Sequence, residues 1–210
     1  MSIKRFSLSQ RIAHFLIALS IMSLFITGMP LLFKQHWLIM ILGGEKVTMF
    51  LHRVFAIVLM ATSLYLIIRN ISIREMIFTP KDIKDFFGDV SFSLGKAEEE
   101  PKYGKYSWIM KASFWFACFE ILVFIITGLI LWFPFFFTQI IPRYNLLTVA
   151  EIHRTLAIMA FLHFSAHSFG NHLHPREFPL NKVIFTGEVS EEKAKHEYPL
   201  WYEKLEAGEK

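Results

Sequence analysis

Four histidines in this sequence lie in long apolar stretches, where a polar side chain costs free energy unless something binds it. His153 and His167 are 14 residues apart. On a helix this separation is a rise of about 21 Å, and the two side chains point within roughly 40° of the same side. His52 and His153 lie near the starts of the second and fourth apolar stretches, and His14 lies at the start of the first. In antiparallel helices these positions form two level pairs, His52 with His153 and His14 with His167.

Each pair suits one iron porphyrin. Two imidazoles facing each other across a gap supply the two axial ligands of a six-coordinate haem b. Zinc is a poorer fit because it needs four ligands at one point, and neither pair has carboxylates or thiolates at ligand spacing. We therefore predict two haem b groups, an outer one held by His52 and His153 and an inner one held by His14 and His167.

Neighbouring residues suit the rest of a haem group. The propionates need cationic partners in low dielectric, and Arg11, Arg53 and Arg154 are the candidates. Their alternative role is to reach lipid headgroups. Gly28 and Gly128 would allow a flat macrocycle to approach the backbone, although helix packing explains glycine equally well.

Two more ionisable residues occur in the apolar stretches, and a third lies just beyond them. An ionised Glu120 would be costly there, so we expect it to be protonated or hydrogen-bonded, with a role in proton relay as the alternative. His163 could replace His167 as the inner ligand, but its depth does not match that of His14. We expect a core histidine bonded to backbone or to a propionate. His172 is assigned to the tail, with a solvated or partner-facing role.

The composition indicates a membrane protein. Of 210 residues 54% are hydrophobic, and the mean hydropathy of +0.41 is too high for a soluble fold of this length. We predict an all-α integral membrane four-helix bundle at 1–175 and a C-terminal tail at 176–210. The four predicted spans, each long enough for a bilayer core of about 30 Å, are 12–33, 47–68, 112–137 and 147–169.

Basic residues predict the orientation of the spans. Lys and Arg number 3 before the first span, 8 from Arg69 to Lys111 and 6 after the fourth span, whereas the two short connections and their flanks hold 5. By the positive-inside rule, both termini and the middle connection are cytoplasmic. The net charge of +4 is modest and scattered, so nothing favours nucleic-acid binding.

The middle connection is expected to contain a short helix. Thr79, Pro80 and Asp82 form a plausible helix start. Apolar residues then follow at i, i+3, i+4 and i+7, namely Ile83, Phe86, Phe87 and Val90. The pattern predicts either a helix at the inner membrane interface or a loop that packs a few apolar side chains on the bundle.

The two halves of the chain are similar to each other. "FITG" at 25–28 precedes "LHRVFAI" at 51–57, and "IITG" at 125–128 precedes "IHRTLAI" at 152–158. These matches predict two helical hairpins of common design, although they are short enough to arise by chance.

A resemblance follows from longer segments. The stretch "RIAHFLIALSIMSLFITGMPLLF", the motif "LHRVFAI", the spacing of His153 and His167, and "FTGEVSEEKAKHEYPLWYEKL" at 185–205 occur together. Together they resemble the gamma, or cytochrome b, subunit of respiratory formate dehydrogenases and the related di-haem cytochromes b of membrane-bound hydrogenases. The resemblance covers nearly the whole chain. It implies a bacterial or archaeal inner-membrane protein that passes electrons between a partner subunit and the quinone pool.

The family also implies a menaquinone site beside the inner haem, to which His167 would contribute. The middle connection of the family has an Asn after a Gly-Lys-Tyr stretch and a Gln shortly afterwards. Here "GKYSWIMK" at 104–111 keeps Tyr106 but has Ser107 and Met110 at those positions. Tyr106 and Ser107 are therefore candidate quinone contacts, and the departure suggests a different quinone pose, a shifted site or another catalytic partner.

Three function classes compete. The first is an electron-transfer subunit that joins an iron-sulfur or multihaem partner to menaquinone or ubiquinone through two haem b groups in the lipid bilayer. The second is a stand-alone quinone oxidoreductase acting on a small molecule at the outer face, against which the tail after Asn171 argues. The third is a haem-free anchor or transporter. Catalysis by the chain alone is expected only toward quinone.

Overall fold

The computed structural model describes residues 2–69, 73–173 and 180–208. These residues form two compact units. One contains Met1–Arg11, Ile71–Phe116 and Asn181–Lys210, and the other contains Ile12–Asn70 and Ala117–Leu180. Each unit is described by itself below.

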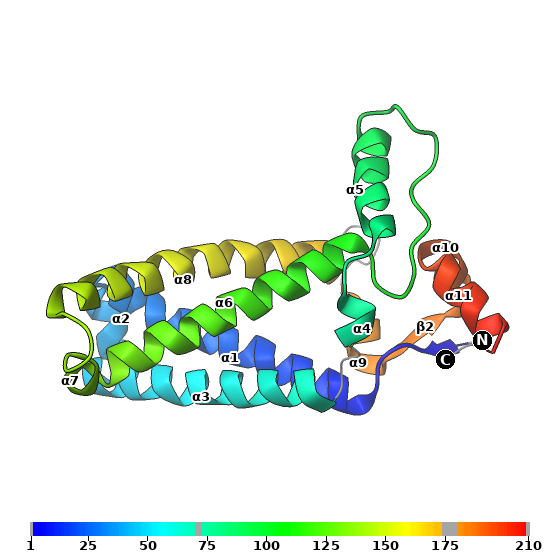
Figure 1. Ribbon diagram of the computed structural model, residues 1–210. Coiled ribbons are helices and arrows are strands. Elements are labelled where there is room, and N and C mark those ends of the chain that lie inside the picture. Colours follow the sequence, from blue (N-terminus) through cyan, green and yellow to red (C-terminus); the bar gives the residue numbers. More distant parts are fainter. Residues whose placement is uncertain (1, 70–72, 174–179, 209–210) are drawn as a thin grey trace. The chain divides into compact units, whose positions relative to one another are not determined.

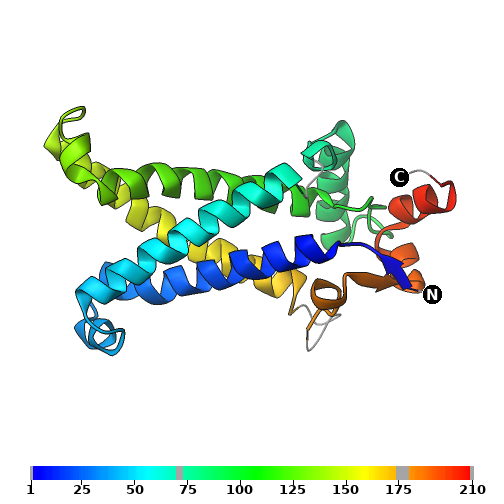
Figure 2. The ribbon, with the colours of Figure 1, turned by 90° about the horizontal axis from the view of Figure 1, so that it is seen from below.

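Four long helices dominate the fold and run side by side (Figures 1 and 2). They are α1 (Leu8–Leu32), α3 (Glu45–Arg69), α6 (Trp108–Trp132) and α8 (Arg143–Asn171). Each is long and apolar enough to cross a membrane, and only 6 to 17% of its most apolar window is buried. Apolar side chains thus face outward, as contact with lipid requires. The predicted all-α membrane bundle of four spans is confirmed.

The ends of all four spans differ from those expected. Helix α1 starts at Leu8 rather than 12, and α3 covers 45–69 rather than 47–68. Helix α6 stops at Trp132 rather than Phe137, because Pro134 has no N–H to continue the helix and instead begins the short α7 (Pro134–Phe137). It also starts at Trp108 rather than 112, since Ser107 Oγ accepts from Met110 N–H at 3.5 Å and Ser107 O from Lys111 N–H at 3.1 Å. Helix α8 starts four residues before the expected 147, directly after Pro142.

Short helices lie in the connections. Helix α2 (His36–Ile41) joins α1 to α3, and α4 (Ile73–Met76) and α5 (Pro80–Ser93) precede α6. The expected helix of the middle connection is therefore present. Its start is as predicted: Pro80 is in the first turn, and the Asp82 carboxylate accepts from the Thr79 backbone N–H at 2.7 Å.

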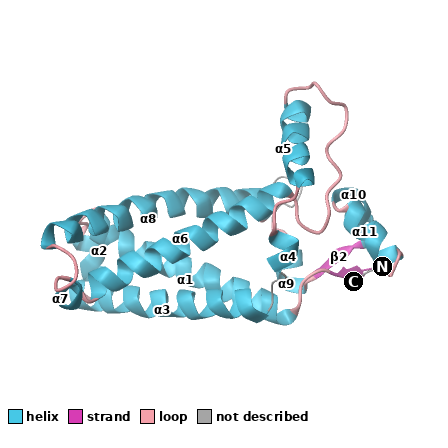
Figure 3. Ribbon diagram, viewed as in Figure 1, coloured by secondary structure: helices cyan, strands magenta, loops and turns pink. Residues whose placement is uncertain are grey.

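The described C-terminal residues fold together with the N-terminus. Strand β1 (Ser2–Lys4) pairs antiparallel with β2 (Glu188–Ser190), with Ile3 opposite Val189 (strands in magenta, Figure 3). Helices α9 (Val183–Thr186), α10 (Glu191–Glu197) and α11 (Pro199–Glu206) flank the strands. A small core contains Val183, Val189, Ala194, Tyr198 and Trp201. This unit thus has an apolar core of its own.

Candidate functional site

In each helical hairpin, a threonine of the first helix forms a hydrogen bond with a histidine of the second helix. Thr27 Oγ1 lies 2.9 Å from His52 Nδ1, and Thr127 Oγ1 lies 2.7 Å from His153 Nδ1. Both hydroxyls donate to a backbone carbonyl four residues earlier, at 2.8 and 2.7 Å respectively. The threonine oxygen therefore accepts at the second contact, and imidazole Nδ1–H donates. This leaves Nε2 of both histidines as the nitrogen available to a metal.

Glycine beside each threonine lets the imidazole lie close to the helix. A Cβ at Gly28 would be 3.0 Å from Cε1 of His52, and one at Gly128 would be 3.6 Å from Cε1 of His153. At the first distance the imidazole would have to shift by a few tenths of an ångström to admit a side chain, whereas the second distance is ordinary contact. Approach of a macrocycle to either glycine stays a prediction.

The inner histidines are brought together as the sequence predicted. The ring centroids of His14 and His167 are 6.1 Å apart with planes 38° from parallel. His172 joins them, 5.4 Å from His14 and 5.3 Å from His167, and each of the three offers a nitrogen within 4.8 Å of the others. The expectation that His172 is a solvated tail residue is wrong, because α8 extends to Asn171 and carries His172 into this cluster.

The inner pair has the spacing that two axial ligands need. A histidine nitrogen binds a metal such as zinc at about 2 Å, so two nitrogens on opposite sides of one ion are about 4 Å apart and their ring centroids roughly 6 Å apart. The separation of His14 and His167 agrees with this value. Neither ring nitrogen of His172 has a hydrogen-bond partner among the described residues, although both are buried. Since His172 is nearly equidistant from the two rings, it occupies space that a macrocycle between His14 and His167 would need, and haem binding by this pair would require His172 to move.

The three candidate arginines have different surroundings. Arg53 lies over the ring of Trp132, with its guanidinium carbon 5.2 Å from the centroid. Arg154 pairs with Glu151 at 2.6 Å, and both side chains are exposed. Arg11 donates to the carbonyl of Phe185 in the C-terminal segment. Contact of these arginines with haem propionates stays a prediction.

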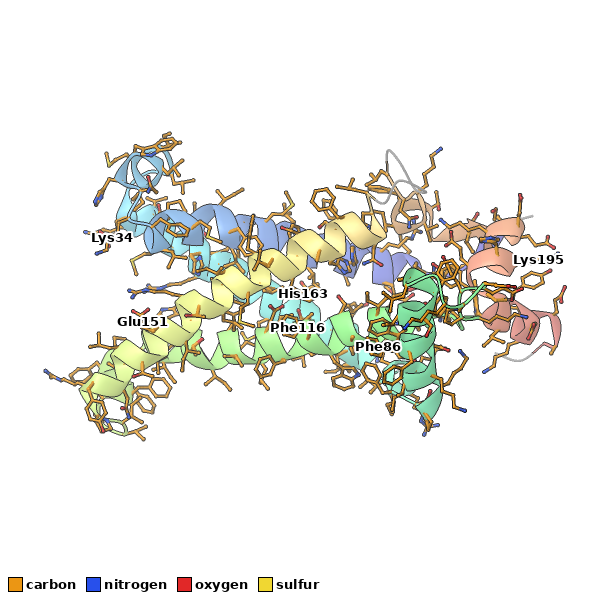
Figure 4. The ribbon with its side chains drawn as sticks, turned by 90° about the horizontal axis from the view of Figure 1, so that it is seen from above. Lys34, Phe86, Phe116, Glu151, His163 and Lys195 are labelled. Atoms are coloured by element: carbon orange, nitrogen blue, oxygen red, sulfur yellow. The ribbon has the colours of Figure 1, made fainter. Side chains whose placement is uncertain are left out.

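A buried pair that sequence reasoning did not connect lies on α6 and α8. His163 Nδ1 is 2.7 Å from Glu120 Oε2, and the other carboxyl oxygen, Oε1, is buried with no hydrogen-bond partner among the described residues. Figure 4 shows His163 on the face of α8 toward α6. Glu120 is thus hydrogen-bonded, as expected, and Nδ1 of His163 contacts its carboxyl group. Proton relay by Glu120 stays a prediction.

The candidate quinone residues have structural partners within their own unit. Ser107 is buried and caps the start of α6. The ammonium of Lys105 lies 5.4 Å from the centroid of the Tyr106 ring. Burial, with a smaller effect of the Glu75 carboxylate, raises the pKa of Tyr106 to about 12, so its hydroxyl remains a hydrogen-bond donor at neutral pH. Their contact with quinone stays a prediction.

Some of these contacts had a signal in the sequence and others had none. The threonines Thr27 and Thr127 occupy the same place in the repeated "ITG" motif, 25 and 26 residues before their histidines. Aligning the two halves would have marked both threonines as candidates, although not their contacts with the histidines. The position of His172 depends on how far α8 extends, which hydrophobic pattern does not define.

Comparison with known proteins finds relatives over nearly the whole chain. The sequence profile of prokaryotic cytochrome b561 matches residues 5–183. The nitrate-inducible formate dehydrogenase cytochrome b556(Fdn) subunit of Escherichia coli K12 is 29% identical over 203 residues, covering 94% of this chain and 86% of that protein. The formate dehydrogenase cytochrome b556(fdo) subunit of the same strain is 24% identical over 214 residues, covering 97% and 93%.

Proposed function

The chain belongs to the prokaryotic cytochrome b561 family, and on this basis we propose that it is the membrane-anchoring di-haem cytochrome b subunit of a respiratory oxidoreductase complex. In this proposal it transfers electrons between a formate dehydrogenase-like partner and the quinone pool. Membership of a cytochrome b family implies haem b. The number of haems, the quinone and the partner are the proposed parts.

The observation that carries the proposal is the pairing of imidazoles. His14 and His167 have the separation of two axial ligands, and the threonine contacts of His52 and His153 leave Nε2 of each free to bind iron. We assign His14 and His167 to an inner haem b, and His52 and His153 to an outer one. When bound, haem would accept and release single electrons.

The residues of the chain would bind and orient the two groups. Thr27 and Thr127 fix the tautomer and rotation of the outer histidines by accepting from Nδ1–H. Helices α1, α3 and α8 hold all four ligands on regular backbone, which keeps the imidazoles in place. Arg11, Arg53 and Arg154 are the proposed propionate partners, and Gly28 and Gly128 the sites of close approach.

The proposed partner is the iron-sulfur or multihaem subunit of the complex. Two relatives are named as formate dehydrogenase subunits, and alignment with them covers 94% and 97% of this chain. Quinone, either menaquinone or ubiquinone, would bind near the inner haem with contributions from His167, Tyr106 and Ser107. We propose that both termini are cytoplasmic and that residues 176–210 serve as a cytoplasmic segment after the membrane domain 1–175.

A haem-to-protein ratio with redox-difference spectra tests the assignment. We expect two haems in the wild type, and one haem or failed assembly after replacement of any proposed ligand. The four ligand variants are His14→Ala, His52→Ala, His153→Ala and His167→Ala. His163→Ala is the matched control, since it removes an imidazole of the same helix as His167, and we expect it to retain both haems. Two haems in His167→Ala would contradict the inner assignment.

A second experiment tests the partner. Chain purified from its native membrane by a C-terminal tag should bring a redox subunit with it, and reduced partner should then reduce the haems. Pure chain that turns over quinol against a small molecule, with no partner bound, would favour the stand-alone quinone oxidoreductase instead.

A further inference from the structure

Helix α5 has two opposite faces, and its polar face is turned inward. At 100° per residue, Asp82, Asp85 and Asp89 lie on one side of the helix, and a stripe of large apolar side chains lies on the other. The stripe consists of Ile83, Phe87, Val90 and Leu94, which are 60%, 62%, 41% and 63% exposed. A helix on a soluble domain would normally bury these residues and expose the acids.

Contacts within the unit hold the acidic face. Lys111 donates to Asp82 at 2.8 Å, and Trp108 Nε1 donates to Asp89, near the other end of the helix, at 2.5 Å. Lys81 of α5 itself pairs with Asp85 at 2.6 Å and also donates to the carbonyl of Lys102 at 2.7 Å. Tyr103 also donates to Asp89. Burial and the Asp89 carboxylate raise the pKa of Tyr103, so its hydroxyl stays a donor. The orientation of α5 is therefore fixed by specific bonds, and the apolar stripe is exposed as a consequence.

These contacts place α5 at the level of lipid headgroups. Helix α6 has 25 residues, which span about 37 Å and exceed a hydrocarbon core of about 30 Å. Its first turn, which ends at Lys111, therefore lies in the interfacial layer. Lys111 binds Asp82 at the start of α5, and Trp115 Nε1 donates to the carbonyl of Met76 in α4 at 2.8 Å. The ring of Phe86 in α5 also packs edge-on against Trp108 in the same first turn, with the centroids 5.0 Å apart.

Other apolar side chains of the same unit are exposed as well. Ile109 of α6 is 58% exposed, and Ile77 and Phe78 before α5 are 51% and 46% exposed. Figure 4 places Phe86 on the side of α5 toward Phe116 of the same unit. This unit therefore exposes apolar side chains on α5, directly before α5 and at the start of α6.

We propose that α5 is an interfacial membrane anchor whose stripe Ile83, Phe87, Val90 and Leu94 inserts between the headgroups of the lipid leaflet at the start of α6. Apolar burial provides the attachment, because the acids of the helix are paired inside the protein and repel no anionic lipid. The anchor would restrain the connection between the second and third spans against the membrane surface.

Fluorescence quenching in the full chain tests this proposal. A bimane fluorophore, whose emission depends on its environment, is attached to the cysteine of Ile83→Cys or of Phe87→Cys, each in a Cys118→Ser background. The labelled chain is then reconstituted in nanodiscs of zwitterionic phospholipid. The matched control is Lys84→Cys, which lies on the polar edge of the same helix. Haem absorbance equal to that of the unlabelled chain shows that each variant is folded.

Acyl chains brominated near the headgroup should quench bimane at 83 and 87, with a blue-shifted emission, and should quench bimane at 84 much less. Aqueous iodide should give the reverse order. Quenching of 83 and 87 by iodide and not by brominated lipid would show that the stripe faces water and would overturn the proposal. Quenching by neither would show that a protein surface covers it, and this result would also overturn it.

Discussion

At the scale of single residues, most of the chemistry comes from imidazoles whose surroundings select one nitrogen. In both hairpins a threonine that already donates to its own helix must accept from Nδ1–H. This arrangement leaves Nε2 without a proton and prevents ring rotation. The same contact occurs in both halves, so the two histidines share this hydrogen bond as well as their sequence motif.

Thr27→Val and Thr127→Val should weaken haem binding without abolishing it. Valine keeps the shape of threonine but leaves Nδ1–H without its acceptor, and loss of such a partner typically lowers metal affinity about 10- to 100-fold. The measurement is the rate of haem transfer to a scavenging apoprotein. Thr48→Val is the control, because Thr48 is equally buried but bonds the carbonyl of Gly44. Equal haem loss in Thr27→Val and Thr48→Val would contradict the proposed role.

His172→Ala should retain both haems, unlike His167→Ala. His172 follows the last residue of α8, whereas His14 and His167 lie within helices that hold their rings in place. The low-spin absorbance spectrum of the variant and its haem count provide the measurement. Loss of one haem in His172→Ala with retention in His167→Ala would exchange the two assignments.

Glu120→Ala should destabilise the bundle more than Glu120→Gln does. Alanine leaves His163 Nδ1 unpaired in a buried position, which costs about 1–3 kcal/mol, whereas glutamine keeps an acceptor there. Thermal unfolding followed by haem absorbance gives the comparison. The same melting temperature for both variants would mean that the carboxyl contact contributes nothing to stability.

At the scale of elements, the start of α6 does more than begin a span. Its residues Trp108, Lys111 and Trp115 bind the segment before it through two side chains of α5 and one carbonyl of α4. The Lys111 and Asp82 side chains are 11% and 6% exposed, so each would be a buried unpaired charge without the other. Burial alone would raise the pKa of Asp82, but hydrogen bonds from Lys111 and Thr79 outweigh it, and the pKa lies below its ordinary value of 3.8.

Because its folded-state pKa is depressed, Asp82 contributes stability that is present above pH 3.8 and is lost as pH falls through the folded-state pKa. At neutral pH, Lys111→Met should release α5 by leaving Asp82 unpaired, at a cost of roughly 3 kcal/mol. Hydrogen exchange of residues 80–93 measures this release. The double variant Lys111→Met with Asp82→Asn should recover part of the protection. Exchange unchanged in the single variant would show that this ion pair does not hold α5.

At the scale of the whole molecule, the N-terminus, middle connection and C-terminal segment share one unit. Arg5 joins all three. Its guanidinium lies 3.7 Å from the centroid of Tyr198 in the C-terminal segment and donates to the carbonyl of Lys105 at 2.8 Å. Gly187 allows this assembly, because at φ +75° a Cβ there would be 2.5 Å from the carbonyl oxygen of Phe6 and 2.9 Å from Arg11 Nε.

Gly187→Ala should therefore loosen the unit. The positive φ and the clash with backbone together should cost about 1–3 kcal/mol. Gly208→Ala is the matched control, since its φ of +74° is the same but nothing lies within 4 Å of its Cβ position. Hydrogen exchange at β1 and β2 should rise in the first variant only. An equal rise in both would show that backbone conformation alone, and not the close approach to Phe6, matters.

The sequence by itself determined that there are four spans and that a helix starts at Thr79, because these follow from local hydropathy and capping residues. The depths of the histidines, which follow from the rise of a helix, stay a prediction. The sequence could not determine contacts between distant segments, which depend on helix rotation and on where each helix ends. Only the tertiary structure therefore brought Thr27 to His52, Glu120 to His163 and His172 to the inner pair. It likewise decided that the acids of α5 face inward, since that choice depends on Lys111 and Trp108, which lie beyond the helix in the chain.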